Sequence, residues 1–160
     1  MSKLMIVPEK PCYIAGAAAL PLSAAEPDYK PVITDANLRR RMGRLLKMSV
    51  YCGLQALGDV ASEKVAGIVT FTGMGFMKDT VSFGNSIYDR DEELLNPSPF
   101  MQSTFNTASG YIALIRKIRS YNTTYVQHAS GFMASFADAV MLLDEYPGQH
   151  VLVGGFDEIT

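Results

Sequence analysis

The chain has 160 residues, of which 48% are hydrophobic and 19% charged, and its formal net charge is −2. That length suits one domain with a buried core, and the apolar fraction excludes a disordered chain. The near-neutral charge gives no electrostatic reason to expect binding to nucleic acid or to an anionic membrane. The two cysteines, Cys12 and Cys52, form neither a disulfide framework nor a metal-binding cluster, so we expect a cytoplasmic protein in which both are core residues.

The N-terminal third predicts a strand followed by a long helix. Residues 12–17 are apolar and predict an opening strand, because a membrane span would need roughly 20 uninterrupted apolar residues. Asp35 or Asn37 can cap a helix that runs to about Asp59. The first half of this helix is basic, which predicts either a solvated face or a docking patch for an acidic partner protein. Its basic residues are Arg39, Arg40, Arg41, Arg44 and Lys47.

An apolar strand and a glycine turn come next. The run Val65–Phe71 is rich in β-branched residues, which is typical of a strand buried on both faces of a parallel sheet. The turn that follows contains Gly73 and Gly75, and glycines allow a backbone to approach a ligand closely. A nucleotide-binding α/β module that uses these glycines is the least favoured hypothesis, because Lys78 occupies the third glycine position of the G-x-G-x-x-G pattern.

Two more helices are expected before the last two strands. Residues 79–93 predict a helix, residues 96–99 a break, and residues from about 100 to 116 a second helix. The residues expected to face inward from the first of these helices are Val81, Phe83, Ile87 and Tyr88.

The segment 122–158 predicts a strand, a tight junction, a helix, a turn and a final strand. Its helix has apolar residues at helical spacing, and the N–H groups of the first turn favour a thiolate or an oxyanion. The alternation of strands and helices predicts a layered α/β fold with right-handed crossovers. The apolar stripe expected to face the core comprises Phe132, Phe136, Val140 and Leu143.

Four segments in this order resemble the β-ketoacyl synthases of the thiolase-like superfamily, above all their aryl-polyene and related polyketide-like branch. They are residues 40–44, 72–75, 96–110 and 151–158. The resemblance implies a thiolase-like layered α/β fold with a mixed, mainly parallel sheet flanked by helices. It implies that residues 1–160 form a single N-terminal-like domain, without the C-terminal half that carries two catalytic histidines.

The resemblance also identifies the position of the nucleophile. In active members the sequence Thr-Ala-Cys opens the nucleophile helix, and counting back from Gly154 and Gly155 places that cysteine at Ala129. The tripeptide is Gln127-His128-Ala129 in this chain. A methyl group cannot accept an acyl chain from a phosphopantetheine thioester. The chain therefore resembles a non-condensing partner subunit, such as a chain-length factor.

An active enzyme is the alternative, an acyltransferase or condensing enzyme in which Ser130 or His128 replaces the thiol. No G-x-S-x-G elbow surrounds Ser130, so we interpret it as a helix cap and a turn hydrogen-bonding residue. We interpret His128 as a buried, hydrogen-bonded side chain and His150 as a structural residue at the start of a strand. No metal or resident cofactor is expected.

The resemblance finally implies partners. A β-ketoacyl synthase acts in fatty-acid or polyketide chain elongation on an acyl group that phosphopantetheine links to an acyl carrier protein. We therefore expect the carrier protein, a competent ketoacyl synthase, or both as partners, in a homo- or heterodimer. The resemblance implies that the strand near Thr123–Val126 pairs with its mate across a two-fold axis.

Overall fold

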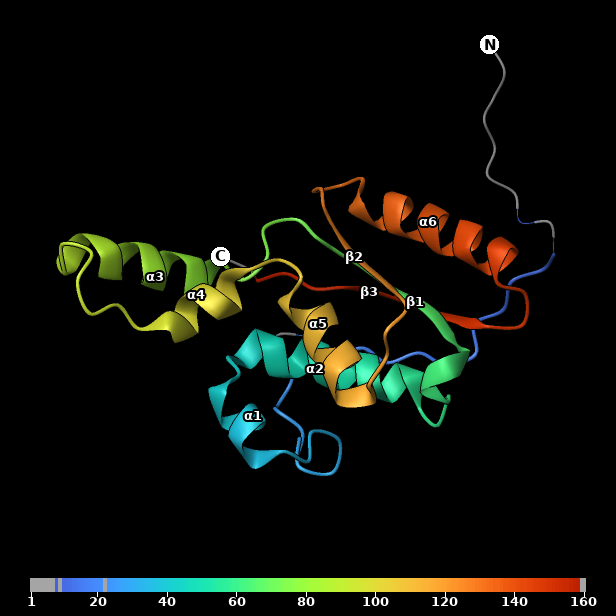
Figure 1. The fold of residues 1–160 in the computed structure, drawn as a ribbon, viewed down its shortest axis with the longest axis horizontal. Coiled ribbons are helices and arrows are strands. Elements are labelled where there is room, and N and C mark those ends of the chain that lie inside the picture. The colour runs from blue at the N-terminus through green and yellow to red at the C-terminus, as the bar shows by residue number, and fades with distance from the viewer. Residues whose placement is uncertain (1–7, 9, 22, 159–160) are drawn as a thin grey trace, which may run out of the picture.

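A computed structural model describes residues 8, 10–21 and 23–158. Its three strands form one parallel sheet in the order β2-β1-β3, and helices cover both faces (Figure 1). The strands are β1 (Val65–Thr72), β2 (Tyr121–Val126) and β3 (His150–Gly155). The helices are α1 (Ala36–Arg41), α2 (Arg44–Leu57), α3 (Met77–Asp89), α4 (Pro97–Ser103), α5 (Thr107–Arg116) and α6 (Gly131–Glu145), with a 3-10 turn at Ser62–Lys64. The predicted α/β class is confirmed.

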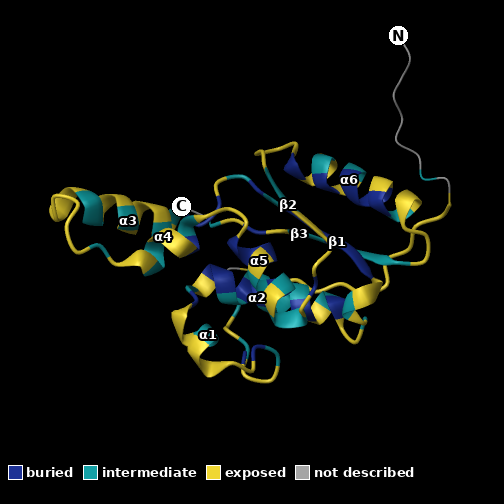
Figure 2. Ribbon diagram, viewed as in Figure 1, coloured by how far each residue is buried: buried dark blue, intermediate teal, exposed yellow. Residues whose placement is uncertain are grey.

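Strand β1 is the centre of the fold. Ile68 lies opposite Asn122 of β2 on one side and Leu152 of β3 on the other. Helices α2 and α5 lie on one face of the sheet and α6 on the other, so almost all of β1 is buried (Figures 1 and 2). The prediction of a strand buried on both faces is confirmed, and the strands that the structure describes are all parallel.

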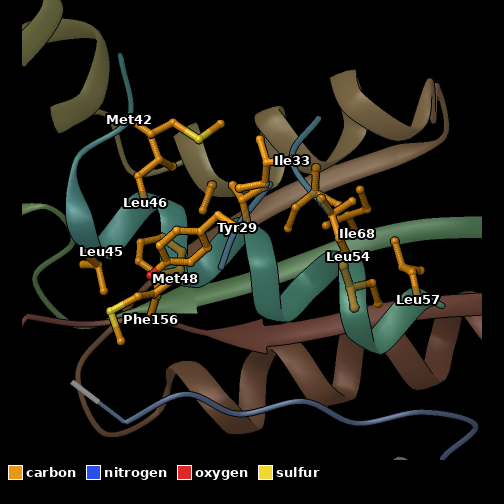
Figure 3. Close-up of a cluster of buried hydrophobic side chains, with 14 of the residues drawn as sticks. Tyr29, Ile33, Met42, Leu45, Leu46, Met48, Leu54, Leu57, Ile68 and Phe156 are labelled. Atoms are coloured by element: carbon orange, nitrogen blue, oxygen red, sulfur yellow. The ribbon is translucent and has the colours of Figure 1, made fainter. Parts of the chain in front are cut away.

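The main hydrophobic core lies between the sheet and helices α2 and α5 (Figure 3). Leu46 and Val50 from α2 meet Ile68 from β1 and Ile112 from α5, and all four are at most 2% exposed. Burying a side chain of this size contributes roughly 1.5–3 kcal/mol. The buried apolar residues of α2 form one side of this core.

The long helix expected to run to Asp59 is in fact two helices. Asp35 caps α1 as predicted, since its Oδ1 accepts hydrogen bonds from the N–H groups of Asn37 (2.8 Å) and Leu38 (3.0 Å). The chain then breaks at Gly43, whose N–H donates to Oε1 of Gln102 over 2.6 Å. The amide of Gln102 also donates to the carbonyl of Arg41. The buried side chain of Gln102 therefore hydrogen-bonds both the N–H of Gly43 and the carbonyl of Arg41 at the break.

The helix expected over residues 100–116 is also divided, into α4 and α5. Asn96 caps α4 through a hydrogen bond from the N–H of Ser98 (3.0 Å), and Pro97 is compatible with the first turn of a helix. The residues expected to form a break therefore begin α4. The division comes at Thr104, where the chain is extended, and the hydroxyl of Thr107 donates to the carbonyl of Met101 over 2.9 Å.

The opening strand predicted over residues 12–17 is wrong. This segment is exposed, with Tyr13 84% and Ile14 90% accessible, and it joins no sheet within the described residues. A strand needs a neighbouring edge for its N–H and C=O groups, and an apolar sequence alone supplies none. Cys12 is exposed as well, so it is not a core residue. Cys52, on α2, is half-buried, and burial raises the pKa of its thiol.

Helices α3 and α4 project from the body of the molecule and form what we call the arm (Figure 1). They pack on each other, with the rings of Phe83 and Phe100 5.2 Å apart. Val81 and Tyr88 were expected to face inward, but both are exposed. An amphipathic pattern predicts a face that packs, and here the packing partner is another helix rather than the sheet.

Helix α6 buries a face that combines small, polar and aliphatic side chains, and its aromatic residues lie mostly outside that face. The buried residues are Gly131, Ser135, Asp138, Ala139, Val140 and Leu142. Phe132 and Phe136 were expected in the core, yet both are exposed, whereas Val140 is buried as predicted. Close approach explains the difference, because a Cβ on Gly131 would lie only 3.3 Å from Phe71. None of the helices in the described ranges is long and apolar enough to span a membrane.

Candidate functional site

The candidate site lies where the three parallel strands end, at one edge of the sheet (Figure 1). Ligands in α/β proteins commonly bind at this edge. Backbone hydrogen bonds hold the segments together: the N–H of Gln127 donates to Thr72 (3.0 Å), and the N–H of Phe156 donates to Phe71 (3.2 Å). The glycine turn, the strand-to-helix junction and the end of β3 therefore become neighbours.

Ala129 lies at the predicted position, in the turn that joins β2 to α6. The turn is exposed, and α6 begins two residues later at Gly131. The N–H of Gly131 donates to the carbonyl of Gln127 over 3.1 Å, which closes the turn. The geometry is that of a side chain presented at a helix N-terminus, where a thiolate would be stabilised. Alanine has no group that can react.

Ser130 occupies the N-cap position of α6 but makes no capping hydrogen bond, so that part of the prediction is wrong. Its hydroxyl donates to Oε1 of Gln127 over 3.1 Å, which is the predicted role within the turn. An amide oxygen accepts a hydrogen bond but is not a base that could take the hydroxyl proton. Nothing in this arrangement activates Ser130 as a nucleophile.

His128 is exposed, so the prediction that it is buried is wrong. Its ring faces the glycine turn: a Cβ built on Gly73 would lie 3.2 Å from Nδ1 of His128 and 3.4 Å from Oδ2 of Asp157. The structure thus brings His128, Gly73 and Asp157 together. His150 begins β3, as expected, and therefore lies at the opposite edge of the parallel sheet.

Asp157 joins the segment after β3 to the glycine turn, and we call its set of hydrogen bonds the Asp157 clamp. Its carboxylate accepts hydrogen bonds from the hydroxyl of Thr72 (2.8 Å) and the N–H groups of Gly73 (2.9 Å) and Met74 (2.9 Å). Burial alone would raise the pKa of Asp157, but these hydrogen bonds outweigh it and hold the pKa below its ordinary value. Sequence reasoning did not assign a role to this residue, although it lies in the family-like segment 151–158, two residues after the Gly-Gly end of β3.

The clamp bears on the nucleotide-binding hypothesis. A glycine turn binds phosphate through free backbone N–H groups, and here those of Gly73 and Met74 donate to Asp157. The N–H of Lys78, in the first turn of α3, donates to Oε2 of Glu158 over 2.7 Å. A phosphate at this turn would compete with two carboxylates, so the structure opposes this hypothesis.

A buried carboxylate ties β2 to α6 behind the junction. Asp138 is 8% exposed, and it accepts hydrogen bonds from the phenols of Tyr121 (3.0 Å) and Tyr125 (3.2 Å). Burial, together with the neighbouring Asp138, raises the pKa of both tyrosines. The spacing of the tyrosines places both on one face of the strand, but their partner could not be predicted, since it comes from a separate helix.

Fold and site together define the N-terminal half of a thiolase-like ketosynthase: a parallel sheet with a helix that begins at a strand-to-helix junction on one face and two helices on the other. The family model described as "Beta-ketoacyl synthase, N-terminal domain" matches residues 16–160. The chain therefore belongs to the β-ketoacyl synthase family, as the resemblance of its sequence segments predicted.

Solved structures share this fold at low sequence identity. A ketosynthase (ApeO) in complex with its chain length factor (ApeC) from Xenorhabdus doucetiae matches with 20% identity and a TM-score of 0.63, over 78% of this chain and 50% of that chain. The ishigamide ketosynthase/chain length factor matches with 18% identity and a TM-score of 0.68, over 83% and 39%. A β-ketoacyl synthase from Burkholderia phymatum STM815 matches with 16% identity and a TM-score of 0.57, over 81% and 32%.

The chain spans about half, or less, of the length of these structures. At such identities the likeness shows the fold, and the roles of Ala129, His128 and Ser130 stay predictions. No curated protein is significantly similar to the chain.

Proposed function

We propose that this protein is a non-condensing, ketosynthase-like subunit in acyl-chain elongation of the aryl-polyene or polyketide type. One observation carries the proposal: the exposed turn that precedes α6 has Ala129 at the position to which the family resemblance assigns the thiolate of a condensing enzyme. The helix N-terminus that would stabilise a thiolate and an oxyanion is present, but the residue that would form the acyl intermediate has no reactive group.

The surrounding residues support the proposal because none replaces the thiol. The hydroxyl of Ser130 is bonded to an amide, and His128 faces the glycine turn. Neither cysteine lies at the junction: Cys52 belongs to α2, which packs on the face of the sheet opposite to α6, and Cys12 lies near His150, at the end of the sheet where β3 begins.

The related structures support a paired role. Two of them contain a ketosynthase together with a chain length factor. We infer that this protein likewise pairs with a competent ketoacyl synthase in the cytoplasm, and that the acyl group reaches the pair on the phosphopantetheine of an acyl carrier protein. Strand β2 is an edge strand with exposed Tyr121 and Val126, so its outer side is open to pairing with another strand.

Acyl transfer from a carrier thioester tests the proposal. Intact mass should show no acyl adduct when the protein is incubated with an acyl-phosphopantetheinyl carrier protein. Ala129→Cys should acquire an adduct, because the helix N-terminus lowers the pKa of a thiol placed there. Ala134→Cys, further along the same helix, is the matched control and should acquire much less.

The enzyme hypothesis predicts a different outcome. An adduct on the unmodified protein that disappears in Ser130→Ala or in His128→Ala would establish acyltransferase activity and refute the non-condensing role. The partner role has its own test, since mixing with a candidate ketoacyl synthase should give a complex of the summed mass in light scattering.

A further inference from the structure

A cavity of about 410 Å³ lies between helix α2 and the end of β3. Leu45 and Met48 of α2 line it together with Phe156, and the three side chains lie close to one another in Figure 3. Residues 18–21 form a further wall, and α5 contributes to the lining as well. A volume of this size is in the range of small-molecule sites. Because α2 and α5 lie on the face of the sheet opposite to α6, the cavity is separate from the turn that holds Ala129.

The cavity is open because a side chain is missing from the core-facing side of β3. Leu152, Gly154 and Phe156 are alternate residues, so they point to the same face of the sheet. Leu152 and Phe156 belong to the hydrophobic core, and each is 8% exposed. Gly154, between them, is half-buried and lines the cavity. A Cβ built on it would meet no heavy atom of the described residues within 4 Å.

The fold requires Gly155 but gives no reason for Gly154. A Cβ on Gly155 would lie 2.3 Å from the ring of Phe71, so only glycine fits there. Gly154 has neither a close neighbour nor a positive φ angle. A glycine inside a strand weakens the strand, and such a glycine often marks a place where a ligand or another backbone approaches closely. No described part of this chain approaches Gly154, which leaves a ligand.

The walls of the cavity determine the chemistry of that ligand. Among the described lining residues there is no lysine, arginine or histidine, and the one carboxylate, Asp157, accepts the hydrogen bonds of the clamp. The hydroxyl of Thr70 is bonded to that of Thr124 over 2.7 Å. The hydroxyl of Ser49 donates to the carbonyl of Leu45 over 2.8 Å, so its oxygen can still accept a hydrogen bond. A charged ligand would lose its hydration here and gain no opposite charge.

We propose that this cavity binds a neutral, apolar small molecule with one hydrogen-bond donor, which meets the hydroxyl oxygen of Ser49. At about 30 Å³ for each water-sized volume, the cavity holds roughly a dozen non-hydrogen atoms. A helix of a partner protein, about 10 Å across, is too wide for it. The ligand lies against the bare backbone of Gly154, and burial of its apolar surface drives binding. The proposal is independent of the proposed function.

A matched pair of fluorescent probes tests the class of ligand. The probe 2-naphthol is flat, apolar and uncharged at neutral pH, and it carries one O–H donor. Fluorescence titration should show it binding with a dissociation constant below about 1 mM. The anion 2-naphthalenesulfonate has the same ring system and should bind at least about tenfold more weakly, because the walls offer it no positive charge. Absence of 2-naphthol binding, or equal binding of the two probes, would overturn the proposal.

Substitution of Gly154 tests the location. Gly154→Val should weaken 2-naphthol binding by about tenfold or more, since the branched side chain occupies the cavity. The variant should fold, because the position is open and valine favours strands. Gly84→Leu is the matched control: it adds an apolar side chain at an equally open glycine on the arm, and it should leave binding unchanged. Unchanged binding in a folded Gly154→Val protein would contradict the site.

The two cysteines give a second measurement that needs no substitution. Cys52 lines the cavity, whereas Cys12 is exposed and lies elsewhere. Saturating 2-naphthol should slow the alkylation of Cys52 by N-ethylmaleimide by several-fold and leave that of Cys12 unchanged, as followed by peptide mass. Equal rates at Cys52 with and without the probe, or equal slowing at both cysteines, would show that the probe binds outside the cavity and would overturn the proposal.

Discussion

The sheet edge and the arm use glycine for opposite reasons. At the edge, Gly75 has φ +68°, and a Cβ there would lie 2.6 Å from the ring of Phe105. On the arm, Gly84 is helical and a Cβ there would meet nothing. The first glycine is required by the fold of this chain, whereas the second weakens its own helix. A glycine without an internal reason directs attention to contacts outside the chain.

Hydrogen bonding differs between these regions in the same way. At the edge, the backbone N–H groups of Gly73 and Met74 in the glycine turn donate to the carboxylate of Asp157. On the arm, the carboxylates of Asp91, Glu92 and Glu93 point to solvent at a strained tip. The backbone donors at the edge are therefore satisfied within the chain. The arm keeps its charges available.

The largest effect is expected for Gly75→Ala. The left-handed backbone and the contact with Phe105 together should lower the free energy of unfolding by about 2 kcal/mol. Urea denaturation followed by circular dichroism measures it. A loss below the error of the measurement would show that the turn relaxes and that the edge is not as constrained as the structure indicates.

Asp157→Asn should cost about 1.5 kcal/mol, since hydrogen bonds to a charged acceptor are lost or weakened. The clamp also predicts an acid dependence. Because folding lowers the pKa of Asp157 below its ordinary 3.8, its contribution is complete above that value and is lost as the pH falls through the folded pKa.

Denaturation at pH values between about 6 and 2 measures this dependence. Wild type should lose more stability over this range than Asp157→Asn does. Equal losses in the two proteins would assign the acid sensitivity to other carboxylates.

Asp138→Asn should destabilise by about 1 kcal/mol, because two phenols keep an acceptor but lose its charge. The pKa values of Tyr121 and Tyr125 are raised, so their contribution to stability is present below pH 10 and is lost as the pH rises through the folded values. Ultraviolet titration should show fewer tyrosines ionising late in Asp138→Asn than in wild type. Identical titration curves would remove Asp138 as the cause.

The smallest effect is expected for Gly84→Ala, which should stabilise the monomer by roughly 0.5–1 kcal/mol through helix propensity alone. Thermal denaturation at low protein concentration measures it without a contribution from association. Gly75→Ala and Gly84→Ala are the same substitution, and we expect them to change the free energy of unfolding in opposite directions. A destabilised Gly84→Ala monomer would show that the chain itself requires this glycine.

Local pattern was enough to predict much of the fold. The apolar run at Val65–Phe71 could only be a buried strand, and Asp35 could be recognised as a cap from its place before the basic helix. The family resemblance assigned the nucleophile position to Ala129, which stays a prediction, and the structure has that residue in the turn before α6. These features depend on neighbours within a few residues or on one helix length.

The features that sequence reasoning missed depend on residues far apart in the chain. The break at Gly43 is made by Gln102, 59 residues away, and the clamp joins Asp157 to Gly73 across 84 residues. Periodicity showed that α3 and α6 have apolar stripes, but it could not show that Tyr88 and Phe132 stay exposed. A stripe predicts that a face can pack and leaves open what packs on it.

By itself, the sequence determined the three strands of the sheet and the approximate positions of the helices. Tertiary structure decided which acceptor each donor meets. Ser130 donates to the amide of Gln127, the glycine turn donates to Asp157, and two tyrosines donate to Asp138. It also decided which apolar faces remain open. Backbone preference and periodicity act between near neighbours, whereas satisfaction of polar groups and burial are set by whatever the fold brings alongside.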